Sequence, residues 1–315
     1  MNGPRISWLP DGRRLHMNHG PIDLIVEAWG DEDEVRAAYD QAAGRFQTVL
    51  GELVAELGEL RRASSVVPRA FAGATAQRME AATSRFADMF VTPMAAVAGA
   101  VADDMLAAML AGRRLAKAYV NDGGDIALHL APGNALTLAI AGTGNGFADR
   151  IEIAHAQPVR GVATSGWRGR SHSLGIADAV TVLAKDAATA DAAATLIANA
   201  VDLPGHQAIS RAPANSLQPD SDLGDRLVTT GVGSLGAADM ATALMRGWTV
   251  AEDYRRRGLI ETAAIFLGDH LMVAGSIGQK ERNGKARLRT HRHPPLSLVA
   301  VENHAGYRSI LETVS

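Results

Sequence analysis

The stretch of sequence that decides the fold lies at residues 120–126, where the chain reads Val120-Asn121-Asp122-Gly123-Gly124-Asp125-Ile126. It separates two segments with the residue pattern of β-strands, 116–120 and 126–130. Paired glycines between two strands predict a tight hairpin turn, because glycine tolerates the positive φ angles that such turns need. The same glycines let a backbone approach a ligand closely, and the asparagine and aspartates are suited to bind a ribose or a polar ring edge. From these residues alone, a plain turn and a nucleotide-binding loop both remain open.

Helical and extended patterns follow one another in blocks along the rest of the chain. Long helices are expected at 31–62 (with Asp31 or Asp33 as N-cap), 75–89, 94–115, 188–201 and 237–258. Strands are expected at 6–14, 22–28, 136–141, 151–156, 160–163, 179–184 and 227–232, with a closing hairpin from 263–273 and 296–301. Blocks of helices between runs of neighbouring strands favour an α+β fold, with antiparallel sheets packed against long helices, over an alternating βαβ fold.

The organisation of the chain follows from the same patterns. Residues 202–225 are rich in proline and polar residues, which predicts an ordered loop. The basic stretch 280–292 is expected to be a solvated hairpin. We expect residues 1–275 to form one domain and residues 276–315 to add a C-terminal hairpin extension to it. Long apolar helices and sheet edges are compatible with a homodimer but do not require one.

Composition excludes several classes of protein and site. The chain of 315 residues has no cysteine, which rules out disulfides, thiolate metal sites and cysteine nucleophiles. A net charge of −3 offers nothing to attract a polyanion, so nucleic acid is not an expected partner. Residues 1–19 are polar and unlike a signal peptide, and the apolar stretch 95–110 contains two aspartates and is too short for a bilayer. We therefore expect a cytoplasmic protein without membrane contact.

A second polar motif lies at residues 163–172, which include the chemically active side chains of Ser165, Arg168, Arg170 and His172. Backbone N–H groups and guanidinium groups are suited to hold a phosphate. A histidine that titrates near neutral pH is suited to move a proton. The alternative is a polar loop with an incidental histidine, and the residue pattern does not separate the two.

A third motif is the pair Asp191 and Thr195, four residues apart on the helix expected at 188–201. At this spacing both side chains project from one face, so a carboxylate and a hydroxyl can point at one hard cation. Mg²⁺ suits such a pair, since it binds few protein oxygens together with phosphate and water. The alternative is that Asp191 is a negative charge favoured by the dipole near a helix N-terminus.

Together and in this order, the motifs resemble the ApbE superfamily, which includes the FAD:protein FMN transferases, and within it the UPF0280 family. The resemblance runs from about residue 19 to residue 275, and the stretches that carry it are 92–102, 120–126, 163–166, 171–180, 190–195 and 211–224. It implies a T-fold-related α+β architecture and an activity on the pyrophosphate of FAD that depends on Mg²⁺. The products it implies are FMN attached to a threonine or serine of an acceptor flavoprotein, or free FMN and AMP.

The resemblance also assigns roles to individual residues. It implies a metal site made of Asp191, Thr195 and the backbone oxygen of Ala102. It gives His172 the position of the catalytic base. It places the flavin nucleotide against a set of turn and loop residues, namely Asn121, Gly123, Gly124, Asp125, Ser165 and Gly166. To these we add Arg168 or Arg170 as a group that stabilises phosphate charge.

The chain departs from the transferases of this superfamily in two places. They have lysine and glycine after the metal-binding alanine, where this chain has Asp103-Asp104, and Asp-Pro-x-x-Gly after the histidine, where it has residues 173–178, Ser-Leu-Gly-Ile-Ala-Asp. Both departures fall beside the expected flavin and base. We therefore hypothesise a Mg²⁺-dependent FMN transferase or FAD-processing enzyme. Two alternatives stay open: a non-catalytic flavin- or nucleotide-binding protein, and a different small-molecule enzyme on the same scaffold.

Overall fold

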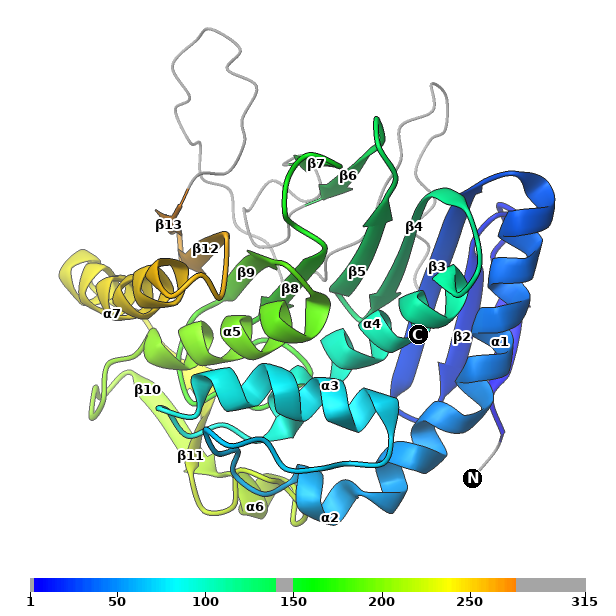
Figure 1. Cartoon of the computed structure of the whole chain (residues 1–315). Helices are drawn as coiled ribbons and strands as arrows, with labels where there is room; N and C mark the ends of the chain where they lie inside the picture. The colour runs from blue at the N-terminus through cyan, green and yellow to red at the C-terminus, as the bar shows by residue number, and fades with distance from the viewer. Residues whose placement is uncertain (1–2, 140–149, 276–315) are drawn as a thin grey trace, which may run out of the picture.

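A nine-stranded sheet, antiparallel throughout, forms the centre of the computed structural model, which describes residues 3–139 and 150–275 (Figure 1). Its strand order is β1-β2-β3-β4-β5-β8-β9-β12-β13. The strands span β1 Arg5–Trp8, β2 Leu15–His19, β3 Ile22–Gly30, β4 Leu115–Asp122, β5 Asp125–Leu130, β8 Gly161–Ser165, β9 Ala179–Ala184, β12 Thr262–Leu267 and β13 His270–Ala274.

The turn between β4 and β5 is the two-residue hairpin that the sequence predicts. Asp122 pairs with Asp125, and the two glycines between them have φ angles of +62° and +117°. Both values lie in the region that side chains other than glycine rarely adopt. The hairpin therefore sets the register of β4 and β5 and places two aspartates side by side at one end of the sheet.

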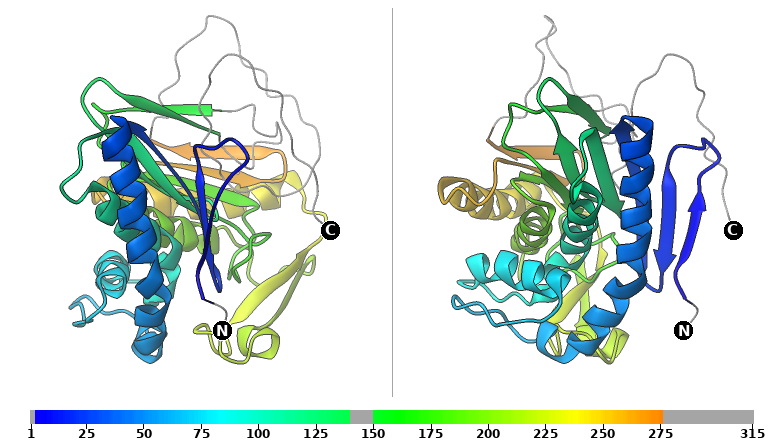
Figure 2. Two further views of the ribbon diagram at one scale, coloured as in Figure 1. Left: turned by 90° about the vertical axis from the view of Figure 1, so that its right-hand side faces the viewer. Right: turned by 45° about the vertical axis from the view of Figure 1, so that its right-hand side comes forward.

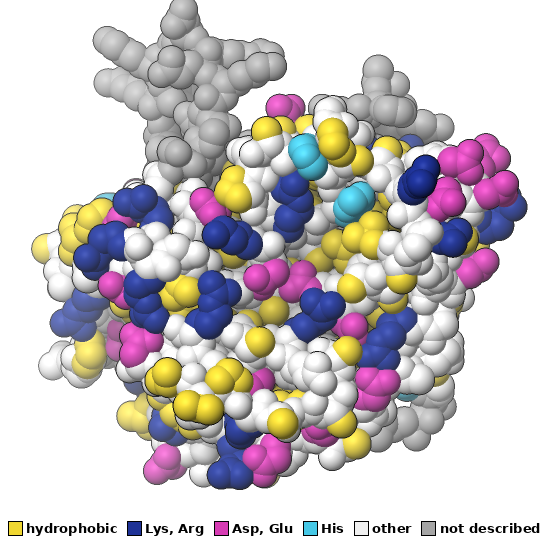
Figure 3. All heavy atoms as spheres, viewed as in Figure 1, with side chains coloured by type: hydrophobic (Ala, Val, Ile, Leu, Met, Phe, Trp, Pro, Cys, Tyr) yellow, Lys and Arg dark blue, Asp and Glu magenta, His cyan; other side chains and the backbone are white. Residues whose placement is uncertain are grey.

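Helices cover one face of this sheet (Figures 1 and 2). The long helices are α1 Glu32–Ala55, α3 Ala74–Thr83, α4 Val97–Leu110, α5 Ala187–Ala200 and α7 Ala237–Arg256, and the short helical turns are α2 Leu57–Leu60, η1 Ser84–Phe86, η2 Pro93–Ala96 and α6 Ala214–Leu217. Helices α4 and α5 pack on the central strands, α1 on β2 and β3, and α7 on β12 and β13. On the side shown in Figure 3, acidic and basic side chains are intermixed rather than gathered into one surface of a single sign.

The opposite face of the sheet is closed by a hairpin of β6 Ala135–Ala139 and β7 Arg150–Ala154. Its apolar side chains, such as Leu138 and Ile153, form a second core with Ile126 and Leu128 of β5. A third, two-stranded sheet of β10 Ile209–Pro213 and β11 Leu227–Val232 extends away from the body of the molecule (Figure 2). Both faces of the central strands are therefore buried, which explains why β9 has no exposed residue.

The predicted α+β class with antiparallel sheets and long helices is confirmed. The predicted helix 31–62 begins as expected, with Asp31 accepting hydrogen bonds from the N–H groups of Asp33 and Glu34, but it ends at Ala55. One helix with its preceding turn, residues 93–110, has the length and the mean hydropathy (1.4) of a membrane span. It is α4, the one such helix in the described ranges, and it packs between α1 and α5 in the core.

Three local predictions are wrong. The expected loop 202–225 contains β10 and α6, and the N-terminal strand and turn are followed by a second strand, β2. The expected strand 263–273 is a hairpin by itself, because Gly268 takes a φ of +59° and returns the chain as β13. The partner predicted for it, 296–301, lies outside the described residues, as do the predicted extension 276–315 and the basic stretch 280–292. The division into a domain and an extension stays a prediction.

Candidate functional site

Helices α4 and α5 cross at their first turns with their backbones almost in contact. A Cβ atom on Gly99 would lie 2.2 Å from the carbonyl oxygen of Ala187, so only glycine fits at this point of α4. From this crossing the two helices extend in opposite directions (Figure 1). Two helix N-termini, whose first N–H groups have no partner within their own helix and carry a partial positive charge, therefore meet under the centre of the sheet.

Each of the two helices caps the other with an aspartate. Oδ2 of Asp191 on α5 accepts a hydrogen bond of 3.0 Å from the N–H of Gly99 on α4. In return, the carboxylate of Asp103 on α4 accepts hydrogen bonds of 3.1 and 2.9 Å from the N–H groups of Ala187 and Ala188. These contacts fix the position of both carboxylates relative to the sheet.

The β4–β5 turn adds two further carboxylates at this place. Asp122 accepts a hydrogen bond of 3.4 Å from the N–H of Asp23, and Asp125 accepts one of 3.2 Å from the N–H of Thr164 on β8. Asn121 closes the turn by accepting a hydrogen bond of 2.8 Å from the N–H of Gly124. We call Asp122, Asp125 and Asp191 the acidic cluster, because their charges act on one another.

Burial and mutual repulsion raise the pKa of every member of the acidic cluster. Burial, followed by the charge of Asp125, raises the pKa of Asp122 to about 8. Burial raises the pKa of Asp191 to about 7, where the hydrogen bond from Gly99 opposes it and the charge of Asp122 adds to it. The pKa of Asp125 is raised well above its usual value by burial and then by the charge of Asp191. The surroundings thus compensate the ionised carboxylates only in part, and the protonated forms are favoured without a ligand.

The loop after β8 brings a cation to the acidic cluster. The guanidinium of Arg170 lies against Gly123, where a Cβ atom would be 2.0 Å from its Nη2, and its charge lowers the pKa of Asp122 and Asp125. Arg168 lies elsewhere, with its Nε 2.7 Å from Oδ1 of Asp178 and its guanidinium 4.6 Å from the ring centre of Trp167. Of the two arginines in the loop, Arg170 is therefore the one beside the cluster.

Of the other residues that the sequence singled out, Ser165 and Gly166 follow Thr164, whose N–H binds Asp125. Ser165 ends β8, half-buried, and Gly166 follows it, buried, with its carbonyl accepting a hydrogen bond from Gly169. His172 is half-exposed, two residues after Arg170 in the same loop. Thr195 is half-buried on α5, one turn beyond Asp191. The structure thus gathers the turn, the end of β8 and the start of α5 at one site.

Ala102, the third predicted metal ligand, lies on α4. It is buried in the interior of α4, where its carbonyl belongs to the hydrogen-bonding pattern of the helix. It lies next to Asp103, which caps the start of α5, whereas Thr195 lies one turn after Asp191 on α5. The assignment of its backbone oxygen as a metal ligand stays a prediction.

The fit of a metal ion rests on the charge of the site. Within residues 3–139 and 150–275, no three His, Asp or Glu side chains gather closely enough to hold a metal by themselves. Mg²⁺ does not need such a group, because it binds through one or two carboxylates together with phosphate and water. The uncompensated carboxylates and the hydroxyl of Thr195 are hard oxygen donors of that kind.

The two departures from the superfamily pattern have structural roles here. Asp103 caps α5, and its neighbour Asp104 binds Arg45 with Oδ2–Nη2 and Oδ2–Nε distances of 2.8 and 3.0 Å. Asp178 holds Arg168, the indole of Trp167 and the N–H of Gly268. The cap by Asp103 was missed from the sequence, which suggested Asp122 for a ribose or a polar ring edge and not for a group of carboxyls.

The chain matches a family model described as "AbpE bacteria" over residues 6–281. It is 37% identical to a UPF0280 protein of Methanothermobacter thermautotrophicus over 129 residues, which are 40% of this chain and 48% of that protein. It is 43% identical to a UPF0280 protein of Methanocaldococcus jannaschii over 116 residues, 35% of this chain and 45% of that protein. These matches span about half the length of each relative.

Two solved structures with a similar arrangement are flavin transferases. The flavin transferase ApbE from Vibrio cholerae is 13% identical, with a TM-score of 0.45 over 84% of this chain and 96% of that chain. The Pseudomonas stutzeri flavinyl transferase ApbE, in its apo form, is 11% identical, with a TM-score of 0.46 over 87% and 95%. The expected relation to the T-fold stays a prediction. The match over residues 6–281 shows the family: the chain belongs to the AbpE bacteria family and is a UPF0280/ApbE-like protein.

Proposed function

We propose that this protein binds FAD at the acidic cluster together with Mg²⁺ and cleaves its pyrophosphate, passing FMN to a hydroxyl acceptor. The observation that carries the proposal is the gathering of three buried carboxyl groups, from the β4–β5 turn and from α5, in front of the N-terminus of α4. Membership of an ApbE-like family supports the flavin nucleotide as the ligand. The acceptor is a threonine or serine of a flavoprotein in the transfer reaction and water in the hydrolytic one.

The metal part of the proposal rests on the energetic cost of the carboxylates. Three carboxylates whose pKa values are all raised are stabilised by a bound divalent cation, which takes the place of the missing positive charge. We propose Asp191, Thr195 and the backbone oxygen of Ala102 as ligands. When bound, Mg²⁺ supplies charge neutralisation for the pyrophosphate and polarises the phosphorus that is attacked.

The side chains of this chain would carry the other parts of the reaction. Asn121, Gly123, Gly124 and Asp125 would lie along the nucleotide, and Ser165 and Gly166 beside it. His172 would take the proton of the acceptor hydroxyl. The hydroxyl oxygen would bond to the FMN phosphorus, and AMP would leave with the bridging oxygen. An imidazole is a common general base for such a proton transfer.

The test is a direct assay of the reaction. Purified protein is incubated with FAD and MgCl₂, with and without candidate flavoproteins, and AMP release and in-gel flavin fluorescence are followed. AMP with a fluorescent acceptor band supports transfer, and AMP alone supports hydrolysis. Bound flavin without turnover would leave a flavin-binding protein instead of an enzyme. Absence of flavin binding would overturn the proposal.

The variant Asp191→Asn tests the metal site separately. An asparagine Oδ1 can still accept the hydrogen bond from Gly99, so α4 keeps its cap and the protein stays folded. AMP release that depends on Mg²⁺ is expected to fall by at least about 100-fold. Asp40→Asn, an exposed aspartate on α1, removes the same charge far from the site and serves as the control. Retained activity in Asp191→Asn would show that the metal assignment is wrong.

A further inference from the structure

Arg170 stands out because its guanidinium is placed by a residue that has no side chain. Gly123 combines a φ of +62° with a position at which a Cβ atom would lie 2.0 Å from Nη2 and 3.1 Å from Cζ of Arg170. The guanidinium therefore rests on the surface of the β4–β5 turn. A side chain at residue 123 would force it away from Asp122 and Asp125.

The loop that carries Arg170 is anchored at Trp167 and Arg168, shortly before Arg170 in the sequence. Oδ1 of Asp178 accepts hydrogen bonds from Nε1 of Trp167 and Nε of Arg168, and the N–H of Trp167 is bonded to the carbonyl of Ala177. Arg170 lies just beyond this anchored part, and its side chain is exposed. It can thus turn between the cluster and a ligand without a change in the rest of the loop.

The charges at the site give Arg170 a function. The guanidinium acts on Asp122 and Asp125, so it compensates only part of the charge of the acidic cluster and repels a further cation by about 1 kcal/mol or more at short range. A guanidinium is also a strong, two-pronged donor to phosphate oxygens. A diphosphate group arriving at the cluster would compete with the carboxylates for it.

We propose that Arg170 is an internal counter-ion, which occupies the approach to the acidic cluster in the free protein and moves onto the diphosphate of the nucleotide. The inference rests on the proposed function for the site itself. In this role Arg170 weakens binding of the divalent cation alone and strengthens binding of the nucleotide. Metal and nucleotide then bind with positive cooperativity, since the nucleotide removes the charge that opposes the metal.

The substitution Arg170→Gln separates the two effects, because they have opposite signs. Mn²⁺ alone, measured by isothermal titration calorimetry without nucleotide, is expected to bind about fivefold more tightly to Arg170→Gln than to the unchanged protein. FAD alone, measured by flavin fluorescence without metal, is expected to bind at least about fivefold more weakly. General damage to the site would weaken both ligands.

Two further variants control for charge. Arg36→Gln removes the same charge from the exposed side of α1 and is expected to change neither affinity. Arg170→Lys keeps the charge, so its Mn²⁺ affinity is expected to stay within about twofold of the unchanged protein. If Arg170→Gln leaves both affinities unchanged, or weakens both, the counter-ion role is wrong while the site stands. If the unchanged protein binds neither Mn²⁺ nor FAD, the proposed function fails.

Discussion

Asp103 and Asp104 are neighbours on α4, yet they lie in two regions that differ in how much positive charge faces a buried carboxylate. Asp104, 6% exposed, meets Arg45 and the hydroxyl of Thr75, 2.6 Å away. Arg45 also holds Glu52 with two hydrogen bonds of 2.7 and 2.6 Å, which lower the pKa of that carboxyl. Asp103 points to the crossing of α4 and α5. Burial there raises its pKa to about 6, although the hydrogen bonds from Ala188 and Ala187 lower it.

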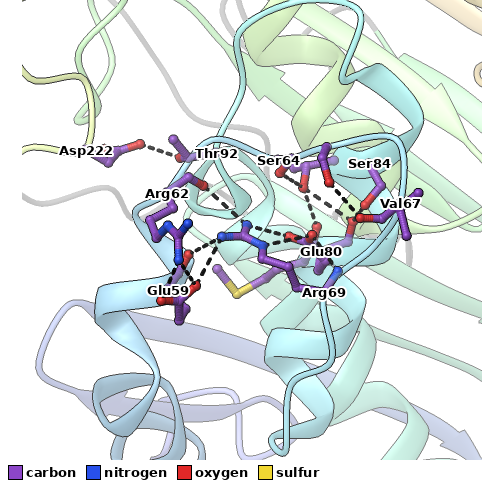
Figure 4. A network of polar contacts seen from close by, with 12 residues as sticks. Glu59, Arg62, Ser64, Val67, Arg69, Glu80, Ser84, Thr92 and Asp222 are labelled. Carbon is purple, nitrogen blue, oxygen red and sulfur yellow. Dashed lines mark hydrogen bonds and ion pairs between the residues drawn. The ribbon is translucent and has the colours of Figure 1, made fainter.

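A second buried carboxylate, Glu80, is paired with an arginine in the same way as Asp104 is paired with Arg45. Glu80 is 1% exposed, and its carboxylate accepts hydrogen bonds of 2.8 and 3.1 Å from Nη2 and Nε of Arg69 (Figure 4). Arg69 also donates a hydrogen bond to the carbonyl of Glu59. In both of these pairs a buried carboxylate meets an arginine with good geometry. At the acidic cluster the protein supplies too little positive charge, which is the mark of a place prepared for a ligand.

The largest effect is expected from breaking the paired region. Asp104→Ala removes the partner of Arg45 and Thr75 inside the protein and leaves their polar groups without full compensation. We expect the free energy of unfolding to fall by about 2 to 3 kcal/mol. Urea unfolding followed by circular dichroism measures it. A loss below about 1 kcal/mol would mean that the paired region does not depend on this contact.

The pH dependence of stability should come from the acidic cluster. The folded state raises the pKa of Asp122 to about 8 and of Asp191 to about 7, above the ordinary value of 3.8. Between these values the folded protein holds protons that the unfolded chain releases, so the free energy of unfolding is largest at low pH and falls as pH rises through 7 and 8. The ligand-free protein should melt about 3 to 6 °C lower at pH ~8.5 than at pH ~6.

The same melting curves contain their own check. FAD with MgCl₂ should reduce the difference between the two pH values, because bound cations stabilise the ionised carboxylates. A melting temperature that rises with pH across this range would contradict the assignment of raised pKa values to the cluster.

Asp122→Asn sharpens the comparison with a change of the opposite sign. An asparagine keeps an acceptor for the N–H of Asp23 and removes one of the repelling charges. At pH ~8.5 and without ligand, the variant should be more stable than the unchanged protein by about 1 kcal/mol, and its dependence on pH should be shallower. Thermal and urea unfolding at two pH values measure both. Destabilisation of the size expected for Asp104→Ala would erase the difference between the regions.

The smallest effect is expected for a pair at the surface of the paired region. Arg62 and Glu59 are both exposed and meet at 2.9 Å, three residues apart (Figure 4). Arg62→Gln should change the free energy of unfolding by less than about 0.5 kcal/mol, because solvent screens such pairs. The same urea assay gives this baseline. A loss above about 1 kcal/mol would show that the network around Arg69 extends to the surface.

Much of the fold could be read from local patterns. The Gly123-Gly124 turn, the Asp31 cap and strands β9 and β11 follow from residues that act on their immediate neighbours. The long helix predicted to residue 62 breaks at Glu56 for a distant reason: its carboxylate accepts hydrogen bonds from the N–H groups of Ala72 and Gly73. Strand β10 was missed because it is defined by pairing with β11, and its Arg211 is held by Leu174 and Asp202.

The sequence by itself determined the α+β class, the hairpin at Gly123-Gly124 and the placing of Asp191 and Thr195 on one helix face, since periodicity and turn chemistry act over a few residues. Only the tertiary structure decided which acids are compensated. Asp104 meets an arginine 59 positions away and Asp191 meets an N–H 92 positions away. Electrostatic energy depends on distance and burial in space, so aspartates that look alike in the sequence became a structural pair in one place and an acidic cluster in the other.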